Sequence, residues 1–324
     1  MSNSTDVPSL LFFVIINSLM LILIVIGVIF GLIVIILIST HKNNHTVPNS
    51  LSCNSCSGGL FYFCVYTVFI IYEYLPEKYR TNPLLCQLQG YMYSVSCCAV
   101  TYSYLVQATN RLFYALFYKY RFLLSSKSAC ILIVIHWSLS FILPFPIIFL
   151  NGYQYQIESQ ICILTTKQFP TAMYGVAAFF FVPLSSVIGI YTIILHNACQ
   201  RTKRYASRAI RKRHHATVYS RRSSRDLKVI RHTVILIGIL TVGGTPYCIL
   251  IILDVLNAAS PEWYLLVTLF ITFSVMADMI VIFAYNKSCI NIIYKPFKYE
   301  PSLNSLSQEQ LKEKPNSLIS SAYC

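Results

Sequence analysis

The chain has 324 residues, of which 56% are hydrophobic and only 11% are charged, and its formal net charge is +14. Soluble domains carry roughly 25% charged residues, so this composition excludes an ordinary soluble fold and predicts a polytopic helical membrane protein. The positive charge lies in loops between apolar runs, which argues against a nucleic-acid partner.

Seven apolar runs follow one another, each long enough for the roughly 20 residues of a membrane-spanning helix. We expect an N-terminal segment at 1–8, one transmembrane domain at 9–297, and a polar, disordered, cytoplasmic tail at 298–324. The fold class is therefore an all-α bundle of seven transmembrane helices. The expected helices cover 9–40, 48–73, 84–113, 129–150, 171–198, 227–257 and 263–286, with a short amphipathic helix at 287–297.

The distribution of basic residues predicts the orientation. With the N-terminus outside, the external loops hold Lys78, Arg80 and Lys167, which is three of the 25 lysines and arginines and leaves 22 on the cytoplasmic side. The positive-inside rule therefore favours an extracellular N-terminus and a cytoplasmic C-terminus. The sequon at Asn3 would then face outside, where it can be glycosylated.

The loop between the fifth and sixth runs is the most basic segment. Residues 200–232 hold twelve lysines and arginines, and Asp226 is their sole acidic neighbour. This charge fits positive-inside topology and attraction to anionic inner-leaflet lipids, or a docking surface for an acidic cytosolic partner. Asp226 itself is either neutralised by Arg222 or Arg225 in its own helix or pairs with a more distant arginine.

The third run joins a cysteine to an arginine without an intervening charge. Cys86 and Arg111 are separated by 25 positions, which corresponds to about 37 Å of helix. That length slightly exceeds the roughly 30 Å hydrocarbon core of a bilayer, so the thiol and the guanidinium are expected at opposite membrane faces. Arg111 then either snorkels and anchors the topology or acts as a functional charge at the membrane edge.

These two residues, with Trp137, Pro183 and Pro246 in the fourth to sixth runs, have a spacing that resembles the rhodopsin-like (class A) G-protein-coupled receptors. The resemblance implies a plasma-membrane receptor that passes a signal from an extracellular ligand to a heterotrimeric G protein. The ligand class is a peptide or a chemosensory small molecule. A membrane transporter or channel is the alternative, although we find no internal repeat and only one carboxylate well inside a span.

The resemblance also implies roles for named residues. Cys86 would form a disulfide with Cys162 in the loop after the fourth helix. Asn110 and Arg111 stand where the family has its Asp-Arg motif, and Asp226 falls where it often has an acid facing that arginine. Tyr191 matches the tyrosine of the fifth helix, so these four residues form the expected G-protein coupling switch.

The sequence departs from the family at several landmarks. Gly243 and Gly244 precede Pro246 where the family has Cys-Trp, so the usual tryptophan is missing. The seventh helix keeps only Asp278 of its Asn/Asp-Pro-x-x-Tyr motif. The second helix lacks its aspartate, and Gly31 or Phe30 stands where the first helix has its asparagine. A bound sodium ion is therefore not expected.

Proline and glycine suggest where helices bend. Proline removes a backbone hydrogen bond, and glycine removes side-chain bulk, so we expect hinges at Pro183, Gly243, Gly244 and Pro246. Ordinary tolerance of these residues in membrane helices is the simpler alternative. Asp278 lies inside a span and must be protonated, paired or hydrated. We expect it to form an internal polar cluster with Asn54 and Ser55.

The expected ligand pocket combines residues of the third, sixth and seventh helices, each of which could equally serve helix packing. Tyr93 stands where amine receptors of this family have an aspartate, and the seventh run has no lysine of the kind opsins use, so an amine or retinal ligand is not expected. External carboxylates at Glu73, Glu77, Asp254 and Glu262 favour a cationic peptide. The pocket residues are Tyr93, Ser94, Cys97, Tyr247, Ile251 and Thr272.

Enzymatic activity is not expected. No HExxH or GxSxG motif and no cluster of metal-ligating side chains appears in the spans, where His136 and His196 stand alone. Accordingly we assign no catalytic residue, metal site or cofactor.

Overall fold

The computed structural model describes residues 10–41, 46–73, 76, 82–156, 161–166, 168–209, 216–286 and 289–290. Within these ranges, the side chains of Leu10, Glu73 and 201–233 are not described. The expected amphipathic helix at 287–297 and the tail at 298–324 therefore lie almost wholly outside the described residues, as do Asn3 and the side chain of Asp226.

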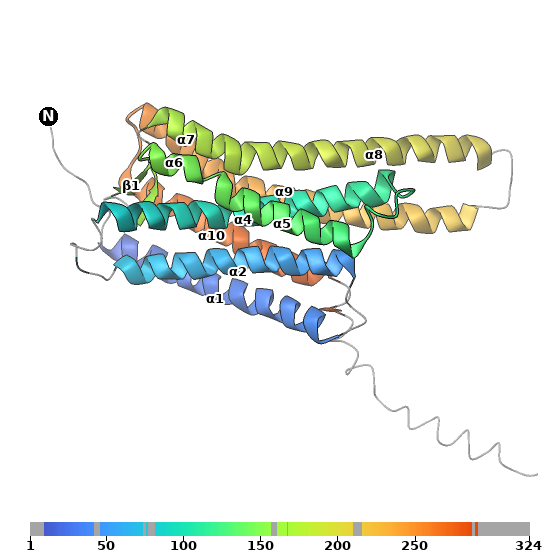
Figure 1. Cartoon of the computed structure of the whole chain (residues 1–324), viewed down its shortest axis with the longest axis horizontal. Helices are drawn as coiled ribbons and strands as arrows, with labels where there is room; N and C mark the ends of the chain where they lie inside the picture. The colour runs from blue at the N-terminus through green and yellow to red at the C-terminus, as the bar shows by residue number, and fades with distance from the viewer. Residues whose placement is uncertain are drawn as a thin grey trace, which may run out of the picture.

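Seven long helices lie lengthwise against one another in a single bundle (Figure 1). The central one, α4, packs against α2, α5 and α8, while α1 and α9 pack against α10. Shorter elements lie between the long helices: α6 (Phe145–Phe149), β1 (Tyr153–Gln156), β2 (Ile161–Leu164), α7 (Phe169–Val176) and the π-helix η2 (Ala177–Phe181). The long helices are α1 (Leu10–Thr40), α2 (Val47–Glu73), α4 (Pro83–Leu116), α5 (Ser126–Ile142), α8 (Val182–Ala209), α9 (Ala216–Val255) and α10 (Pro261–Tyr285).

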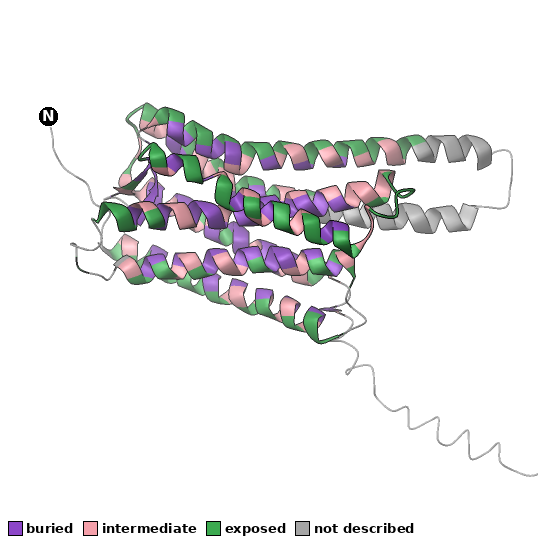
Figure 2. Cartoon of the chain, viewed as in Figure 1, coloured by how far each residue is buried: buried purple, intermediate pink, exposed green. Residues whose placement is uncertain are grey.

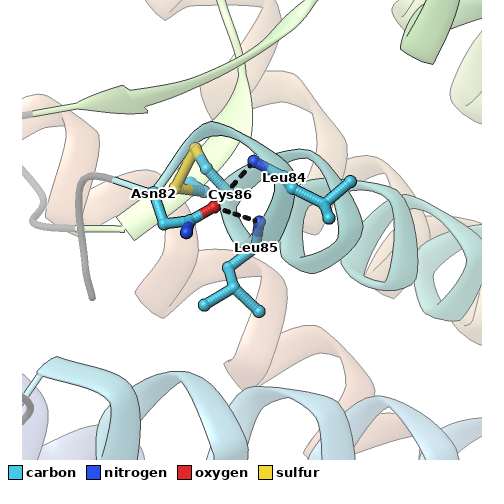
Figure 3. The surroundings of a disulfide bond; sticks show 5 residues. Asn82, Leu84, Leu85 and Cys86 are labelled. Atoms are coloured by element: carbon cyan, nitrogen blue, oxygen red, sulfur yellow. Dashed lines mark hydrogen bonds between the residues drawn. A yellow bond between two sulfur atoms is a disulfide. The ribbon is translucent and has the colours of Figure 1, made fainter.

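Asn82 fixes the start of α4. Its Oδ1 accepts hydrogen bonds from the backbone N–H groups of Leu84 at 3.0 Å and Leu85 at 3.3 Å (Figure 3). These two groups have no partner inside the helix, and Pro83 at the first helical position has no N–H to satisfy. The cap therefore holds Cys86, one turn further on, in a defined position.

The fourth apolar run does not form one continuous helix, contrary to the expected span of 129–150. It is divided into α5 and α6 at Leu143 and Pro144. Pro144 and Pro146 both lack a backbone N–H, so the ladder of helical hydrogen bonds cannot continue through them. Asn151, with φ of 49°, then turns the chain into β1.

The antiparallel hairpin of β1 and β2 is an element that the sequence did not predict. Tyr153 pairs with Leu164 and Tyr155 with Cys162 in its register. Both strands contact α4. The hairpin therefore covers one end of the central helix.

Six helical segments in the described part of the chain are long and apolar enough to cross a membrane by length and composition. The central helix α4 is not among them, because its buried face carries polar residues such as Gln89, Ser96, Ser103 and Gln107. Those side chains are buried in the bundle, whereas many residues of α1 are exposed (Figure 2), and the large ones among them are aliphatic. An outer surface this apolar matches the hydrocarbon of a bilayer. The six segments are Leu11–Thr40, Val47–Tyr72, Ser126–Phe149, Phe169–Gln200, Val234–Val255 and Pro261–Tyr285.

Candidate functional site

A disulfide joins β2 to the first turn of α4. Cys86 and Cys162 are bonded, with their Cα atoms 5.1 Å apart, as the family resemblance implied. Next to this bond, Gly90 lets the Tyr153 ring lie directly on the helix, since a Cβ at Gly90 would be 2.6 Å from Tyr153 Cδ1. Burial raises the pKa of the Tyr153 phenol, so this ring is neutral. We call this part of the molecule the disulfide end.

The opposite end of α4, which we call the Arg111 end, carries the expected switch residues. Arg111 Nη1 donates a 2.7 Å hydrogen bond to the Tyr191 hydroxyl of α8, and the guanidinium carbon lies 5.9 Å from the centroid of that ring. Tyr191 and Asn110 are both buried. The structure thus brings Arg111 and Tyr191 together next to Asn110. Asp226, the fourth expected member, has no described side chain.

The π-helix η2 is explained by Pro183. Because Pro183 has no N–H, the helix before it widens, and the Val182 N–H bonds the Ala177 carbonyl five residues back. In that pattern the Ala178 carbonyl would need the N–H of residue 183, which is a proline. Tyr102 of α4 supplies the missing donor, with its hydroxyl 2.9 Å from the Ala178 oxygen. A tertiary hydrogen bond therefore completes the bend.

Gly243 and Gly244 of α9 are positions of close packing. A Cβ at Gly243 would be 2.5 Å from Ser274 Oγ of α10, and a Cβ at Gly244 would overlap the Phe180 ring of η2. Ser274 Oγ also donates a 2.6 Å hydrogen bond to the Ile239 carbonyl, one turn before the glycines. The missing side chains thus admit α10 and η2 to the surface of α9. Pro246 lies inside α9, which continues to Val255.

Tyr62 of α2 connects two of the expected pocket residues. Its ring centroid is 5.8 Å from that of Tyr93, and its hydroxyl lies 3.0 Å from Thr272 Oγ1. Cys97 packs against the same cluster of apolar side chains as Tyr93. The Tyr93 hydroxyl is buried beside the hydroxyl of Tyr62 and the thiol of Cys97. Residues of α2, α4 and α10 therefore meet around one buried phenol.

The other expected pocket residues contact the elements that follow α5. Ser94 interacts with the Tyr153 hydroxyl, and the Tyr247 hydroxyl donates a 3.3 Å hydrogen bond to the Leu164 carbonyl of β2. Ile251 instead packs against Ala172 and Val176 of α7. The six residues thus occupy two neighbouring environments.

The described contacts of Asn54 and Ser55 are with residues other than Asp278. Asn54 faces α5, where its Oδ1 accepts a 3.0 Å hydrogen bond from Trp137 Nε1 and its Nδ2 lies 3.5 Å from His136 Nδ1. Ser55 accepts a 2.6 Å hydrogen bond from Gln107 of α4. Asp278 lies beside Tyr104 of α4. The apolar run of α2 did not indicate which of its sides faces which helix.

Met279 stands where the family has the proline of its seventh-helix motif, and it packs against glycines of the first and second helices. Its thioether lies between two glycines, since a Cβ at Gly59 would be 2.5 Å from Met279 Cε and a Cβ at Gly31 would be 3.5 Å from Met279 Sδ. Met279 is fully buried next to Asp278. A flexible apolar side chain thus fills the space where α1, α2 and α10 meet.

Sequence reasoning missed Tyr62 and Tyr102. The chain has 24 tyrosines, and no local pattern separates these two from the others. Only the packing of α2, α4 and η2 shows which hydroxyl meets which partner.

A seven-helix bundle with a disulfide-anchored hairpin at one end and an arginine at the other end of its central helix has the architecture of a seven-transmembrane receptor. Residues 31–294 match the family model described as "7 transmembrane receptor (rhodopsin family)". The chain belongs to this family, and it is therefore a multi-pass protein of the plasma membrane. This membership favours a receptor over the transporter or channel alternative.

Two curated relatives are the neuropeptide S receptors of Macaca mulatta and Homo sapiens. Each is 26% identical over 183 residues, which cover 54% of this chain and 49% of the relative. The aligned part thus spans about half the length of the curated relatives that the chain matches. Squid rhodopsin has a similar structure, with a TM-score of 0.72 over 96% of this chain and 94% of that one. At 16% identity, this likeness supports the fold alone.

Proposed function

We propose that this receptor couples the binding of an extracellular ligand to a heterotrimeric G protein. The supporting observation is the contact of Arg111 with Tyr191, at the end of the bundle remote from the disulfide. In this proposal the disulfide end faces outside and residues 200–232 face the cytosol, in agreement with the distribution of basic residues. An epitope tag in 200–232 should be detected only after cells are permeabilised.

Arg111 is the switch residue of the proposal. In the resting state it is held by Tyr191 and Asp226, and in the active state it meets the G protein. A partly exposed ion pair contributes only about 0.2–1 kcal/mol. A difference of about 1.4 kcal/mol already changes a two-state ratio tenfold, so losing one such contact is enough to raise basal activity several-fold.

The proposed ligand is a peptide that enters from the disulfide end. The names of the neuropeptide S receptors support a peptide, while a chemosensory small molecule is the second candidate. Tyr93 is the central residue of the proposed pocket, because its buried ring meets Tyr62 of α2 and packs in the same cluster as Cys97. Ser94, Cys97, Tyr247, Ile251 and Thr272 complete the proposed pocket.

Movement between the two ends would pass through the bends of α8 and α9. The proposed hinges are Pro183, Gly243, Gly244 and Pro246. A π-helix precedes Pro183, and the two glycines let neighbouring helices approach α9 closely. Anionic lipids of the inner leaflet are proposed partners of the basic residues in 200–232.

The switch is tested by basal second-messenger output at equal surface expression. We expect Arg111→Ala to abolish signalling and Asp226→Ala to raise ligand-free signalling several-fold. Arg121→Ala is the matched control, because it removes an exposed positive charge at the same end of the molecule. If Asp226→Ala leaves basal output unchanged while Arg111→Ala silences the receptor, the ion-pair lock is wrong and the coupling role stands. If Arg111→Ala signals normally, the proposed function is wrong.

A further inference from the structure

A crevice opens at the disulfide end between the end of α9, the start of α10 and the segment after β2. Its volume is about 440 Å³, and its lining includes Thr166, Phe169, Asp254, Asn257 and Tyr264. None of the six expected pocket residues lines it. The crevice is thus a separate site, nearer the end of the bundle than the proposed pocket.

The Asp254 carboxylate is held in place by two hydroxyl groups. Tyr264 donates a 2.6 Å hydrogen bond to Oδ1, and Thr166 donates a hydrogen bond to Oδ2. Thr166 and Tyr264 are buried, whereas Asp254 is half-buried at the crevice. A carboxylate accepts about four hydrogen bonds, so its two described donors leave acceptor capacity for a group that enters the crevice.

Both donors to Asp254 are neutral, so they orient its negative charge without compensating it. The lysine and arginine side chains that the structure describes are Arg111, Lys119, Arg121 and Lys127, and all four belong to the Arg111 end. Lys167, the neighbour of Thr166, lies outside the described residues, and the experiment below therefore includes it.

The walls of the crevice suit a long cationic side chain. Phe169 and Val255 are more than half exposed and apolar, so they can cover an aliphatic stem while its charged tip reaches the carboxylate. A guanidinium or ammonium group would make charge-assisted hydrogen bonds to oxygens that are already fixed.

We propose that Asp254 binds the side chain of an arginine or lysine in a peptide ligand, with Tyr264 and Thr166 as positioning residues. The proposal rests on the proposed function, because it requires a peptide at the disulfide end. It also separates Asp254 from Glu262, a second carboxylate of this end that lies in the first turn of α10 and does not line the crevice.

The experiment uses the purified full-length receptor in lipid nanodiscs and two probes. The first is the peptide acetyl-Phe-Arg-Phe-amide, and the second contains citrulline, which has nearly the shape of arginine but no charge. Binding is measured without a G protein, so failure of coupling would not affect the result. We expect the arginine peptide to bind wild type about 10- to 100-fold more tightly than the citrulline peptide. Equal binding of the two probes would overturn the proposal without any variant.

Substitutions then locate the site. Asp254→Asn, which keeps the shape of the side chain, should abolish the preference for arginine, whereas Glu262→Gln removes the same charge nearby and should keep it. Tyr264→Phe should keep a preference that is several-fold smaller, because Oδ1 loses its fixed donor. A full preference in Asp254→Asn would overturn the proposal. So would a preference that appears only in Lys167→Gln, because Lys167 would then be the partner of Asp254.

Discussion

The two ends of the bundle are held by different kinds of interaction. At the disulfide end, a covalent bond fixes β2 to α4. There, Asp254 also accepts hydrogen bonds from the hydroxyl groups of Thr166 and of Tyr264 in α10. At the Arg111 end, the described polar link between α4 and α8 is the hydrogen bond from Arg111 to Tyr191. A hydrogen bond can be exchanged for a bond to water or to a partner protein, but the disulfide cannot. The comparison indicates a permanent structure at one end and a reversible one at the other.

Breaking the disulfide should have the largest effect. Cys86→Ser, Cys162→Ser and the double variant should lose surface expression to the same degree, because each removes the same bond. The expected loss is about 2–5 kcal/mol of stability. Surface expression is measured by flow cytometry with an N-terminal tag. Normal expression of either single variant would show that the disulfide end does not depend on this bond.

Gly90→Ala should have the next largest effect. The added Cβ would lie 2.6 Å from Tyr153 Cδ1 and 3.0 Å from Tyr153 Cβ. Because the Tyr153 Cβ does not move when the ring rotates, a simple rotation of the ring would not make room. Overpacking of this kind costs about 1–3 kcal/mol, and Tm of the purified receptor should fall. Gly189→Ala is the control, because nothing lies within 4 Å of its added Cβ, and Tm should stay constant or rise. Equal behaviour of the two variants would contradict the tight packing of the hairpin on α4.

Tyr191→Phe should have the smallest effect on stability, about 0–1 kcal/mol, because Arg111 is only half-buried and water can replace the hydroxyl. Basal signalling should nevertheless rise. Tyr102→Phe removes a hydroxyl of the same type but leaves the buried Ala178 carbonyl without its donor, so about 1–3 kcal/mol should be lost. Tm and basal second-messenger output separate the two variants. A larger loss of Tm in Tyr191→Phe would mean that the Arg111 end is not the weaker one.

The sequence predicted the membrane runs better than it predicted their contacts. The observed α1 and α2 differ by no more than one residue at either end from the expected 9–40 and 48–73, because loss of apolar character coincides with the helix ends. The sixth helix begins at Ala216 rather than near 227, since helical hydrogen bonding continues beyond the apolar part that a membrane requires. An apolar run therefore predicts the membrane-spanning part of a helix but not the residue at which the helix begins or ends.

The site was predictable where a residue type fixes its own partner. A cysteine at the disulfide end requires another cysteine, so Cys86 and Cys162 could be paired through the resemblance. Asn54 could form hydrogen bonds with many partners. Because α2 is apolar on several sides, its sequence does not indicate which side of the helix faces which neighbour. Its bond to Trp137 and the placement of Asp278 beside Tyr104 therefore emerged only from the structure.

The contact between Phe180 and Gly244 has a consequence for the timing of any movement. Because the ring occupies the place of a missing side chain, a turn of α9 about its axis would drive a larger residue into η2. The two helices must therefore move together, or the ring must first leave its position in a closely packed interior. A substitution at this contact would alter how often the receptor changes conformation, even where both conformations keep their relative stability.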